Sequence, residues 1–447
     1  MPDTHLTDRQ EHLADHHGDA VPEHPTVRGG LALWTLFLGF AMLMIGNGLN
    51  LAVLGVRVVG FGVQTSGYVM ACYFAGFLLG PAVVVRLLSS VGHIRVFASL
   101  ASVASCAVLV HFLWVSAPGW ALLRFVFGFC MAGLYVVVES WLNDASTARN
   151  RGRTLAVYML VSMGGLAVGQ LLIATGDPNG YALFVVASIL VSMSFVPIAL
   201  AATTEAPPVR LADRLGLREL AHVAPTGLVG MLFTGASHGI LFGLAAVYAT
   251  ESGFSAGRTA IFIAVPSIGA LVLQWPIGWA SDRFPRRGVI FVVALAASSL
   301  CALLAVVAPG SALVIPMMLV LGGLTFPLYS LLLSHTLDRS APGQAMGASG
   351  TLLRVNGTGA VLGPIIGASL MAATGEATMF WCLVATHGLI AVYVGYRVVA
   401  EDALPMSRQG PFVPMPARAT DFAIRLTARP LPGSRARLRR PRQRSEV

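Results

Sequence analysis

The chain has 447 residues, of which 56% are apolar and only 11% charged, and its mean hydropathy is +0.75. A water-soluble particle of this size needs more polar surface than this composition supplies, so lipid is the expected solvent for most of the chain. The net charge of +9 comes from arginine alone. In such a chain it indicates topology and attraction to anionic lipid, and it is no sign of nucleic-acid binding.

The N-terminal stretch, residues 1–28, is polar and mixes acidic side chains with histidines. This composition is typical of a disordered cytoplasmic tail. His12 with His16 or His17 has helical ligand spacing, so a metal-sensing tail is the alternative. No rigid shell of supporting neighbours is visible around these histidines, and we assign no metal site. Because the stretch is polar, we expect no cleavable signal peptide; the first apolar run serves as an uncleaved insertion signal.

Twelve apolar runs follow, each of about 20 residues, the length that a helix needs to cross about 30 Å of hydrocarbon. They lie at about 31–54, 65–85, 94–115, 119–140, 154–174, 181–202, 225–249, 259–280, 288–308, 312–334, 350–372 and 378–398. The expected fold class is an all-α membrane protein with twelve transmembrane helices. An even number of spans places both chain ends on the same side of the membrane.

The distribution of arginine predicts which side that is. The loops on the side of the chain ends contain Arg86, Arg95, Arg149, Arg151, Arg153, Arg210, Arg214, Arg218, Arg283, Arg286, Arg287 and Arg339. The opposite loops contain only Arg57 and Arg258. By the positive-inside rule both termini are expected in the cytoplasm, with anionic lipid as the partner of the basic face.

The chain divides into two bundles joined by a polar linker. We expect six-helix bundles over residues 29–203 and 224–400, with a cytoplasmic linker over 204–223. In this region Leu211, Leu215 and Leu220 alternate with charged residues, which suggests a short interfacial helix. Residues 401–447 are rich in proline and arginine, and we expect a basic disordered tail on the cytoplasmic leaflet.

The two bundles look like copies of each other. A shift of 194 residues (322 minus 128) places Gly128, Leu134, Tyr135, Ser140 and Asp144 on Gly322, Leu328, Tyr329, Ser334 and Asp338. The same shift places Gly165 and Gly169 on Gly359 and Gly363. The matches keep one register over about 40 residues, so duplication explains them better than chance.

Three motifs resemble signatures of the major facilitator superfamily. The loop after the eighth run resembles the family's loop signature through Gly278, Asp282, Arg283, Arg286 and Arg287. Arg124 with Gly128 resembles a second signature, and Gly359, Gly363, Pro364 and Gly367 resemble the Gly-Pro antiporter signature. The segments VVVES and TARNRGRTLAVYM are similar to the YcaD-like branch of bacterial inner-membrane transporters.

This resemblance implies two pseudo-symmetric six-helix bundles in the bacterial cytoplasmic membrane. It also implies that Gly278, Asp282, Arg283, Arg286 and Arg287 form a conformational latch. Asp282 is expected to face the positively polarised start of the fifth span, near Thr154, when the cytoplasmic side is closed. The loop after the second run departs from the family pattern, because it has Gly92 and no acidic residue.

Ionisable residues inside spans are functional candidates, because a charge at the membrane centre costs at least about 2.5 to 3.5 kcal/mol. Arg124 could hold an anionic substrate or control the protonation of an acid; the alternative is that it snorkels to the outer headgroups. His238 could respond to a proton gradient, or it could be a neutral packing histidine. The remaining substrate or cavity candidates, on spans that line the family's cavity, are Asn47, Asn50, Tyr135 and Tyr329.

Glu139 is the acidic residue clearly embedded in a span, which makes it the candidate for coupling to protons. Arg354 lies at similar depth in the other half, so the two could form an ion pair that seals the inner gate. The alternative is that Glu139 caps local backbone near Arg149 or Arg153 while Arg354 reaches lipid phosphate.

Two glycine pairs should allow close helix packing. Gly165 with Gly169, and Gly359 with Gly363 next to Pro364, have no side chains to keep a neighbouring helix away. We expect both pairs at the interface between the halves.

No enzyme motif is present: the sequence has no Walker motif, no lysine and no catalytic triad spacing. We expect no enzyme and no cofactor. The leading hypothesis is a monomeric secondary transporter of a small organic solute by alternating access, driven by protons, with export favoured by the Gly-Pro signature. The alternatives are an uptake symporter of the same fold, a channel, and a receptor or scaffold that does not transport.

Overall fold

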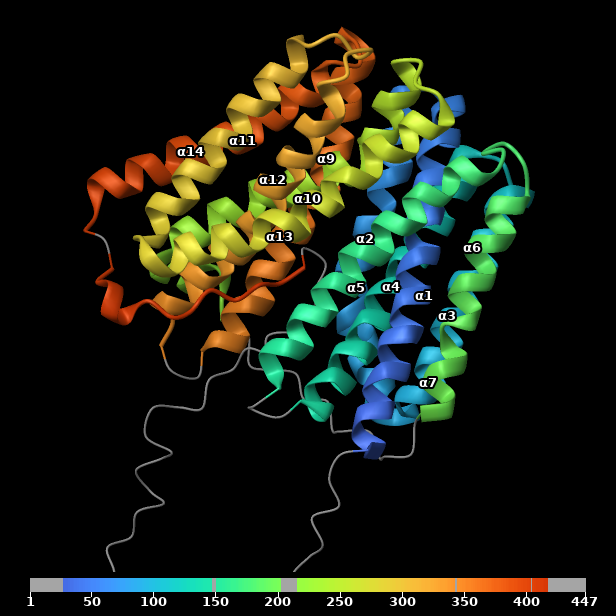
Figure 1. The fold of residues 1–447 in the computed structure, drawn as a ribbon, viewed down its shortest axis with the longest axis horizontal. Helices are drawn as coiled ribbons and strands as arrows, with labels where there is room; N and C mark the ends of the chain where they lie inside the picture. The colour runs from blue at the N-terminus through green and yellow to red at the C-terminus, as the bar shows by residue number, and fades with distance from the viewer. Residues whose placement is uncertain (1–26, 147–149, 202–214, 342–343, 403, 417–447) are drawn as a thin grey trace, which may run out of the picture.

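The computed structural model describes residues 27–146, 150–201, 215–341, 344–402 and 404–416. Within these residues twelve helices are long and apolar enough to cross a membrane, and no strand occurs. Figure 1 shows two bundles side by side, one coloured blue to green and the other yellow to red. The all-α fold with twelve spans is confirmed.

The first bundle contains α1 to α7. Their bounds are α1 Val27–Arg57, α2 Val63–Val91, α3 His93–Leu113, α4 Ala117–Ala145, α5 Arg151–Leu171, α6 Ala182–Met193 and α7 Phe195–Ala201, with 3-10 turns η1 Val58–Phe61 after α1 and η2 Leu172–Thr175 after α5. The expected sixth span is a single span interrupted by a turn at Ser194, which separates α6 from α7.

The second bundle contains α9 to α14, preceded by a short helix. The bounds are α8 Leu217–Val223, α9 Pro225–Glu251, α10 Ala256–Arg283, α11 Arg286–Val306, α12 Val314–Arg339, α13 Ala345–Thr374 and α14 Thr378–Ala400, with a 3-10 turn η3 Met406–Arg408 near the chain end. Leu220 of α8 and the preceding Leu215 are both buried against protein, and the location of this helix at the membrane interface stays a prediction. Leu211 and the histidine-rich tail lie outside the described residues.

Equivalent helices of the two bundles pack through equivalent glycines. A methyl group on Gly128 of α4 would lie 2.0 Å from the carbonyl oxygen of Tyr73 in α2. One on Gly322 of α12 would lie 2.2 Å from the carbonyl oxygen of Pro266 in α10. Both helix pairs therefore approach backbone to backbone at matching positions, which supports the internal duplication read from the sequence.

The predicted location of the glycine pairs is wrong. Gly165 and Gly169 pack α5 against α1 inside the first bundle, and a methyl group on Gly169 would lie 2.0 Å from the Ile45 carbonyl oxygen. Gly359 and Gly363 pack α13 against α9 inside the second bundle in the same way. A pair of glycines four residues apart indicates a close neighbour, but it does not say which helix that neighbour is.

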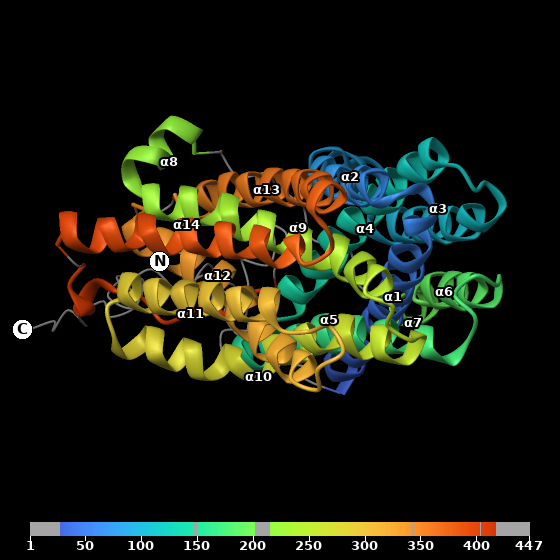
Figure 2. The same ribbon diagram turned by 90° about the horizontal axis from the view of Figure 1, so that it is seen from above.

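Other residues bring the halves together. Gly67 of α2 packs against Pro364 and Ala368 of α13, and Gly55 of α1 packs against Ala246 of α9. Because α1 runs from the first described residue to Arg57, these contacts lie on the side away from the chain ends. We call the other side, where the described chain begins, the terminal side (Figure 1). Figure 2, seen from above, shows α2 of the first bundle beside α13 of the second.

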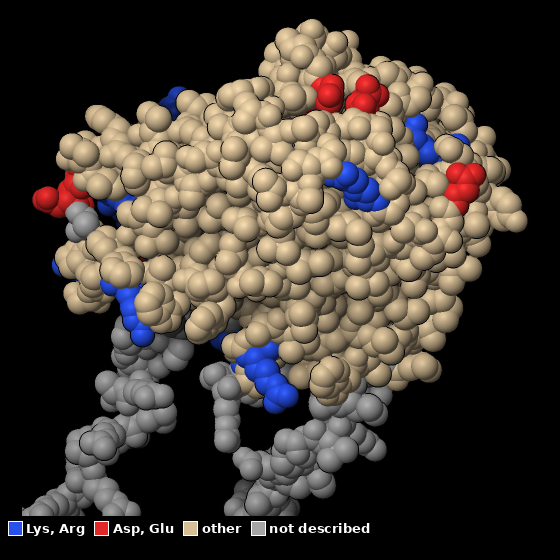
Figure 3. Space-filling model, turned by 45° about the horizontal axis from the view of Figure 1, so that its top comes forward, with Lys and Arg blue, Asp and Glu red and all other residues tan. Residues whose placement is uncertain are grey.

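On the terminal side a cavity of about 500 Å³ separates α5 from α10. Met159 and Leu160 contribute from α5, and Trp275 and Trp279 from α10. The halves are thus in close contact on one side. On the terminal side the cavity lies between the terminal parts of α5 and α10, which pack together further along. Figure 3 shows a face that is mostly free of Lys, Arg, Asp and Glu, as a lipid-embedded bundle requires.

The expectation of disorder from residue 401 onward does not hold for residues 404–416. This segment turns back beneath the second bundle and lies along α12 (Figure 1). It contains four prolines among its thirteen residues, so its composition resembles a disordered tail. Its position depends on hydrogen bonds between its backbone and side chains of the bundle, which composition does not reveal.

Candidate functional site

Arg124 of α4 is fully buried in the first bundle. Its guanidinium carbon lies 4.7 Å from the ring centroid of Tyr73 in α2, in a cation–π contact. The alternative that Arg124 snorkels to the headgroups is therefore wrong. The close approach of α2 and α4 leaves the guanidinium among side chains of the bundle.

Glu139, about four turns further along α4, is also fully buried. It accepts a hydrogen bond of 2.5 Å from the hydroxyl of Tyr158 in α5. The Tyr158 ring stacks on Phe40 of α1 at 5.2 Å, and Tyr135 of α4 meets Phe40 edge-on at 5.5 Å. Three helices thus meet at a carboxyl group with a hydroxyl donor.

Sequence reasoning found Glu139 and missed Tyr158. A hydrogen bond to a charged group contributes about 1.5 to 3 kcal/mol, a large share of the cost of keeping a carboxylate in hydrocarbon. A search for hydroxyl-bearing residues in the span that follows the acid could have found the tyrosine. The spacing of 19 residues has no meaning until α4 and α5 are placed together.

Arg354 is exposed on α13 in the second half. Glu139 accepts its hydrogen bond from Tyr158, inside its own half. The gate pair between Glu139 and Arg354 stays a prediction, and it concerns the state in which the terminal side is closed.

His238 of α9 stacks on Phe326 of α12, with ring centroids 5.1 Å apart and planes inclined by 26°. The six substrate or cavity candidates are all buried, at most 3% exposed. They are Asn47, Asn50, Arg124, Tyr135, His238 and Tyr329. None of them lines the cavity between α5 and α10. They lie on α1, α4, α9 and α12, as the sequence predicts, but in this conformation they are enclosed by protein.

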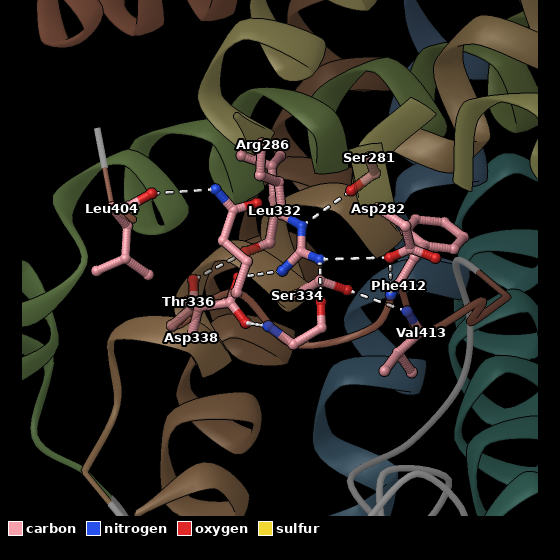
Figure 4. A network of polar contacts seen from close by, with 12 residues as sticks. Ser281, Asp282, Arg286, Leu332, Ser334, Thr336, Asp338, Leu404, Phe412 and Val413 are labelled. Atoms are coloured by element: carbon pink, nitrogen blue, oxygen red, sulfur yellow. Dashed lines mark hydrogen bonds and ion pairs between the residues drawn. The ribbon is translucent and has the colours of Figure 1, made fainter. Parts of the chain in front are cut away.

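The expected latch residues form a polar network at the terminal end of the second bundle (Figure 4). Arg286 forms an ion pair with Asp338 of α12, and its Nε donates to Ser281 at 2.9 Å. Asp282 accepts a hydrogen bond of 2.6 Å from the backbone N–H of Phe412. Asp282 also lies 3.9 Å from the Arg286 guanidinium, so its partners here belong to its own half, whereas the sequence predicts the start of α5 for the closed state.

The neighbouring basic residues hold the end of α14. Arg287 pairs with Glu401 and also donates to the carbonyl oxygen of Arg397 at 3.0 Å. Burial alone would raise the pKa of Glu401, but the hydrogen bond from Arg287 and the charges of Arg287, Arg397 and Arg339 hold that pKa below its ordinary value. Arg283 instead lies over the ring of Trp279, 4.1 Å from its centroid.

Among the described residues, no group of three His, Cys, Asp or Glu side chains is arranged to hold a metal ion. The site in the first bundle instead contains the Arg124 guanidinium over the Tyr73 ring and the carboxyl–phenol pair of Glu139 and Tyr158. This arrangement can bind an anion or exchange a proton, and it offers no nucleophile paired with a base.

Comparisons with known proteins agree with this geometry. The family model described as Major Facilitator Superfamily matches residues 36–355. An uncharacterized MFS-type transporter of Enterobacter sp. (strain 638) is 29% identical over 76% of this chain and 88% of its own. The uncharacterized MFS-type transporter YcaD of Escherichia fergusonii is 31% identical over 68% of this chain and 79% of its own.

Solved structures share the fold at low sequence identity. The nucleoside transporter NupG has a TM-score of 0.66 at 14% identity, covering 83% of this chain and 98% of NupG. A bacterial homolog of the human lysosomal transporter Spinster, in an inward-facing and unoccupied conformation, has a TM-score of 0.64 at 15% identity, covering 86% and 98%. The chain is a multi-pass inner-membrane protein that transports a solute, is not an enzyme, and belongs to the YcaD-like transporters of the major facilitator superfamily.

Proposed function

We propose that this transporter moves a small organic solute by alternating access and is driven by protons that bind Glu139. The observation that carries the proposal is the buried pair of Glu139 and Tyr158 between α4 and α5. A carboxyl group in hydrocarbon is much less costly when protonated than when ionised. Its protonation state is therefore linked to any movement that changes how far it is from water.

The arginine distribution supports a cytoplasmic terminal side. Among the described residues, the loops and helix ends of the terminal side hold most of the arginines. Arg57 at the end of α1 and Arg258 near the start of α10 lie on the other side of the molecule. With this orientation the cavity between α5 and α10 lies toward the cytoplasmic side of the molecule. We therefore propose an inward-open state, from which an exporter would load its solute.

Arg124 favours a solute with an anionic group. A guanidinium buried near Tyr73 offers charge and an aromatic face, which suits an organic carboxylate or phosphate better than a cation. His238 and Phe326 supply an aromatic surface in the opposite half. We therefore propose an organic anion with an apolar part as the substrate class.

Proton coupling can be tested before the solute is known. The protein is reconstituted in liposomes, and currents are recorded on a solid-supported membrane while a library of organic anions is applied with and without a pH gradient. We expect at least one compound to give a saturable current that rises with the gradient and is lost with an uncoupler. A current that does not saturate would instead indicate a channel.

Glu139→Gln should remove the dependence on the pH gradient while leaving the fold intact, because glutamine keeps the shape but cannot ionise. Glu251→Gln, at the exposed end of α9, is the matched control and should behave as the parent protein. Gradient-driven flux that survives Glu139→Gln, or that follows sodium and not protons, would contradict the proposal. The sign of the flux in oriented vesicles separates export from uptake.

A further inference from the structure

The chain ends in an extended segment that the transport proposal does not use. We call residues 404–416 the C-terminal strap. It follows α14 and runs along the terminal part of α12, on the side of the second bundle that faces α5 (Figures 1 and 4). Met415 is 1% exposed, although it lies only fifteen residues beyond the last span.

A row of polar side chains on one face of α12 binds the backbone of the strap. Ser330, Ser334 and Asp338 are each four residues apart, so they lie on the same helix face. Ser334 accepts from the N–H of residue 413 at 3.2 Å, and Asp338 accepts from the N–H of residue 410 at 2.7 Å.

Ser330 binds both backbone groups of one residue. Its hydroxyl accepts from the N–H of Met415 at 2.9 Å and lies 3.0 Å from the carbonyl oxygen of Met415, to which it donates. Gln274 of α10 donates to the same hydroxyl at 3.0 Å and so orients it. Recognition of alternate backbone groups by a row of fixed side chains is how a groove binds an extended peptide.

Residues of the latch complete this groove. Arg286 donates to the carbonyl oxygen of Gly410 at 2.6 Å, and Asp282 accepts from the N–H of Phe412. The ring of Phe412 lies over Gly278, where a methyl group would be 2.6 Å from the ring. The family-like motif Gly278, Asp282 and Arg286 is thus occupied by the strap.

The strap also fills space that the two halves must share on closing. Phe412 and Pro414 line the cavity between α5 and α10, opposite Ala156 and Met159 of α5. If Asp282 approaches the start of α5 when the terminal side closes, the Phe412 ring stands between them. Closure therefore requires the strap to leave.

We propose that Ser330, Ser334 and Asp338, with Asp282 and Arg286, form an intramolecular peptide-binding groove whose ligand is the C-terminal strap, and that the bound strap holds the transporter open on the terminal side. The strap is a built-in inhibitor that must be released in each cycle or by a signal. The second part of this inference rests on the alternating-access proposal, whereas the groove itself does not.

Cysteine labelling of the full chain tests the groove. In a variant whose five native cysteines are alanines, Met415→Cys reports the bound part of the strap, and Met406→Cys, 40% exposed in the same segment, is the matched control. We expect a membrane-impermeant maleimide to label position 415 at least about tenfold more slowly, because labelling requires local opening. Ser330→Ala with Ser334→Ala should bring position 415 to the control rate, and Ser330→Thr should not. Equal rates at both positions in the parent would overturn the groove.

Distances between the halves test whether the bound strap holds the terminal side open. Spin labels at Arg153→Cys and Phe284→Cys, exposed at the terminal ends of α5 and α10, report closure. We expect the parent to show mainly the longer distance and Phe412→Ala with Ser334→Ala to add a shorter one. If the distribution of distances between the two spin labels is unchanged in this variant, the strap does not hold the terminal side open. Glu139→Gln tests the proposed function separately. If this variant keeps its response to the pH gradient, proton coupling through Glu139 is contradicted, but the difference in labelling rate between positions 415 and 406 is unaffected.

Discussion

At the scale of single residues, the buried carboxyl group of Glu139 has a hydrogen-bond donor that affects its ionisation. The Tyr158 hydroxyl can stabilise the ionised form through a charge-assisted bond, which is roughly twice as strong as a neutral one. Both side chains are fully buried, so this bond does not compete with bulk water. Arg124 lies in the same bundle, about 22 Å from Glu139 along α4 at 1.5 Å per residue, too far to neutralise it directly.

The first prediction concerns this pair. A double-mutant cycle of Glu139→Met and Tyr158→Phe, measured as free energy of unfolding in detergent or bicelles, should give a coupling of about 1.5 to 3 kcal/mol. Each single change leaves a buried polar group without its partner, whereas the double change removes both. Tyr396→Phe, at an exposed tyrosine, is the control and should cost nothing measurable. A coupling below about 0.5 kcal/mol, within ordinary additivity, would show that the bond is not important.

At the scale of helices, glycine decides which pairs approach backbone to backbone. The contact of α13 with α9 leaves no room at Gly359, where a methyl group would lie 1.9 Å from the carbonyl oxygen of Leu232. The carbonyl belongs to the helix backbone and cannot turn aside, so the helices would have to separate. Separation would also loosen Pro364, which carries the contact to Gly67 in the other half.

Gly359→Ala should therefore lower the free energy of unfolding by at least about 1 to 3 kcal/mol, the usual cost of overpacking. Gly288→Ala in α11 is the matched control, because nothing lies within 4 Å of the added methyl group. There the loss of backbone freedom in the unfolded chain should make alanine neutral or mildly stabilising. Thermal unfolding of the two purified variants provides the measurement. Equal midpoints of thermal unfolding for the two variants would mean that α13 and α9 can move apart without loss of stability.

At the scale of the whole molecule, two bundles close one side while the other is open. Close contacts of α2 with α13 and of α1 with α9 lie on one side. On the other, a cavity lies between α5 and α10, lined in part by Phe412 and Pro414 of the strap. Alternation requires an opposite state with contacts on the terminal side. Glu139 and Arg354 are the pair that the sequence offers for it.

A charge exchange tests this gate. Glu139→Arg and Arg354→Glu should each abolish transport, because each brings like charges together and leaves one partly buried, an error that can cost about 3 to 5 kcal/mol. The double exchange should recover part of the flux. A double variant no better than either single one would remove the pair from the gate, and the bond to Tyr158 would then be the main role of Glu139.

The sequence by itself determined the helices, their number and the membrane location. These depend on local composition, since a run of about 20 apolar residues must span the bilayer whatever its neighbours are. The repeat of Gly128 and Gly322 also revealed the duplication before any helix was placed. Individual polar residues such as Glu139 stood out because hydrocarbon makes them costly.

Only the tertiary structure decided the partners. The glycine pairs pack inside each half and not between halves, Tyr158 reaches Glu139, and Asp282 binds residue 412. Each of these contacts joins residues that are distant in sequence, so no periodicity encodes it. The strap shows the reason most clearly: its composition is that of a tail, and it is ordered because fixed side chains on α12 satisfy its backbone hydrogen bonds.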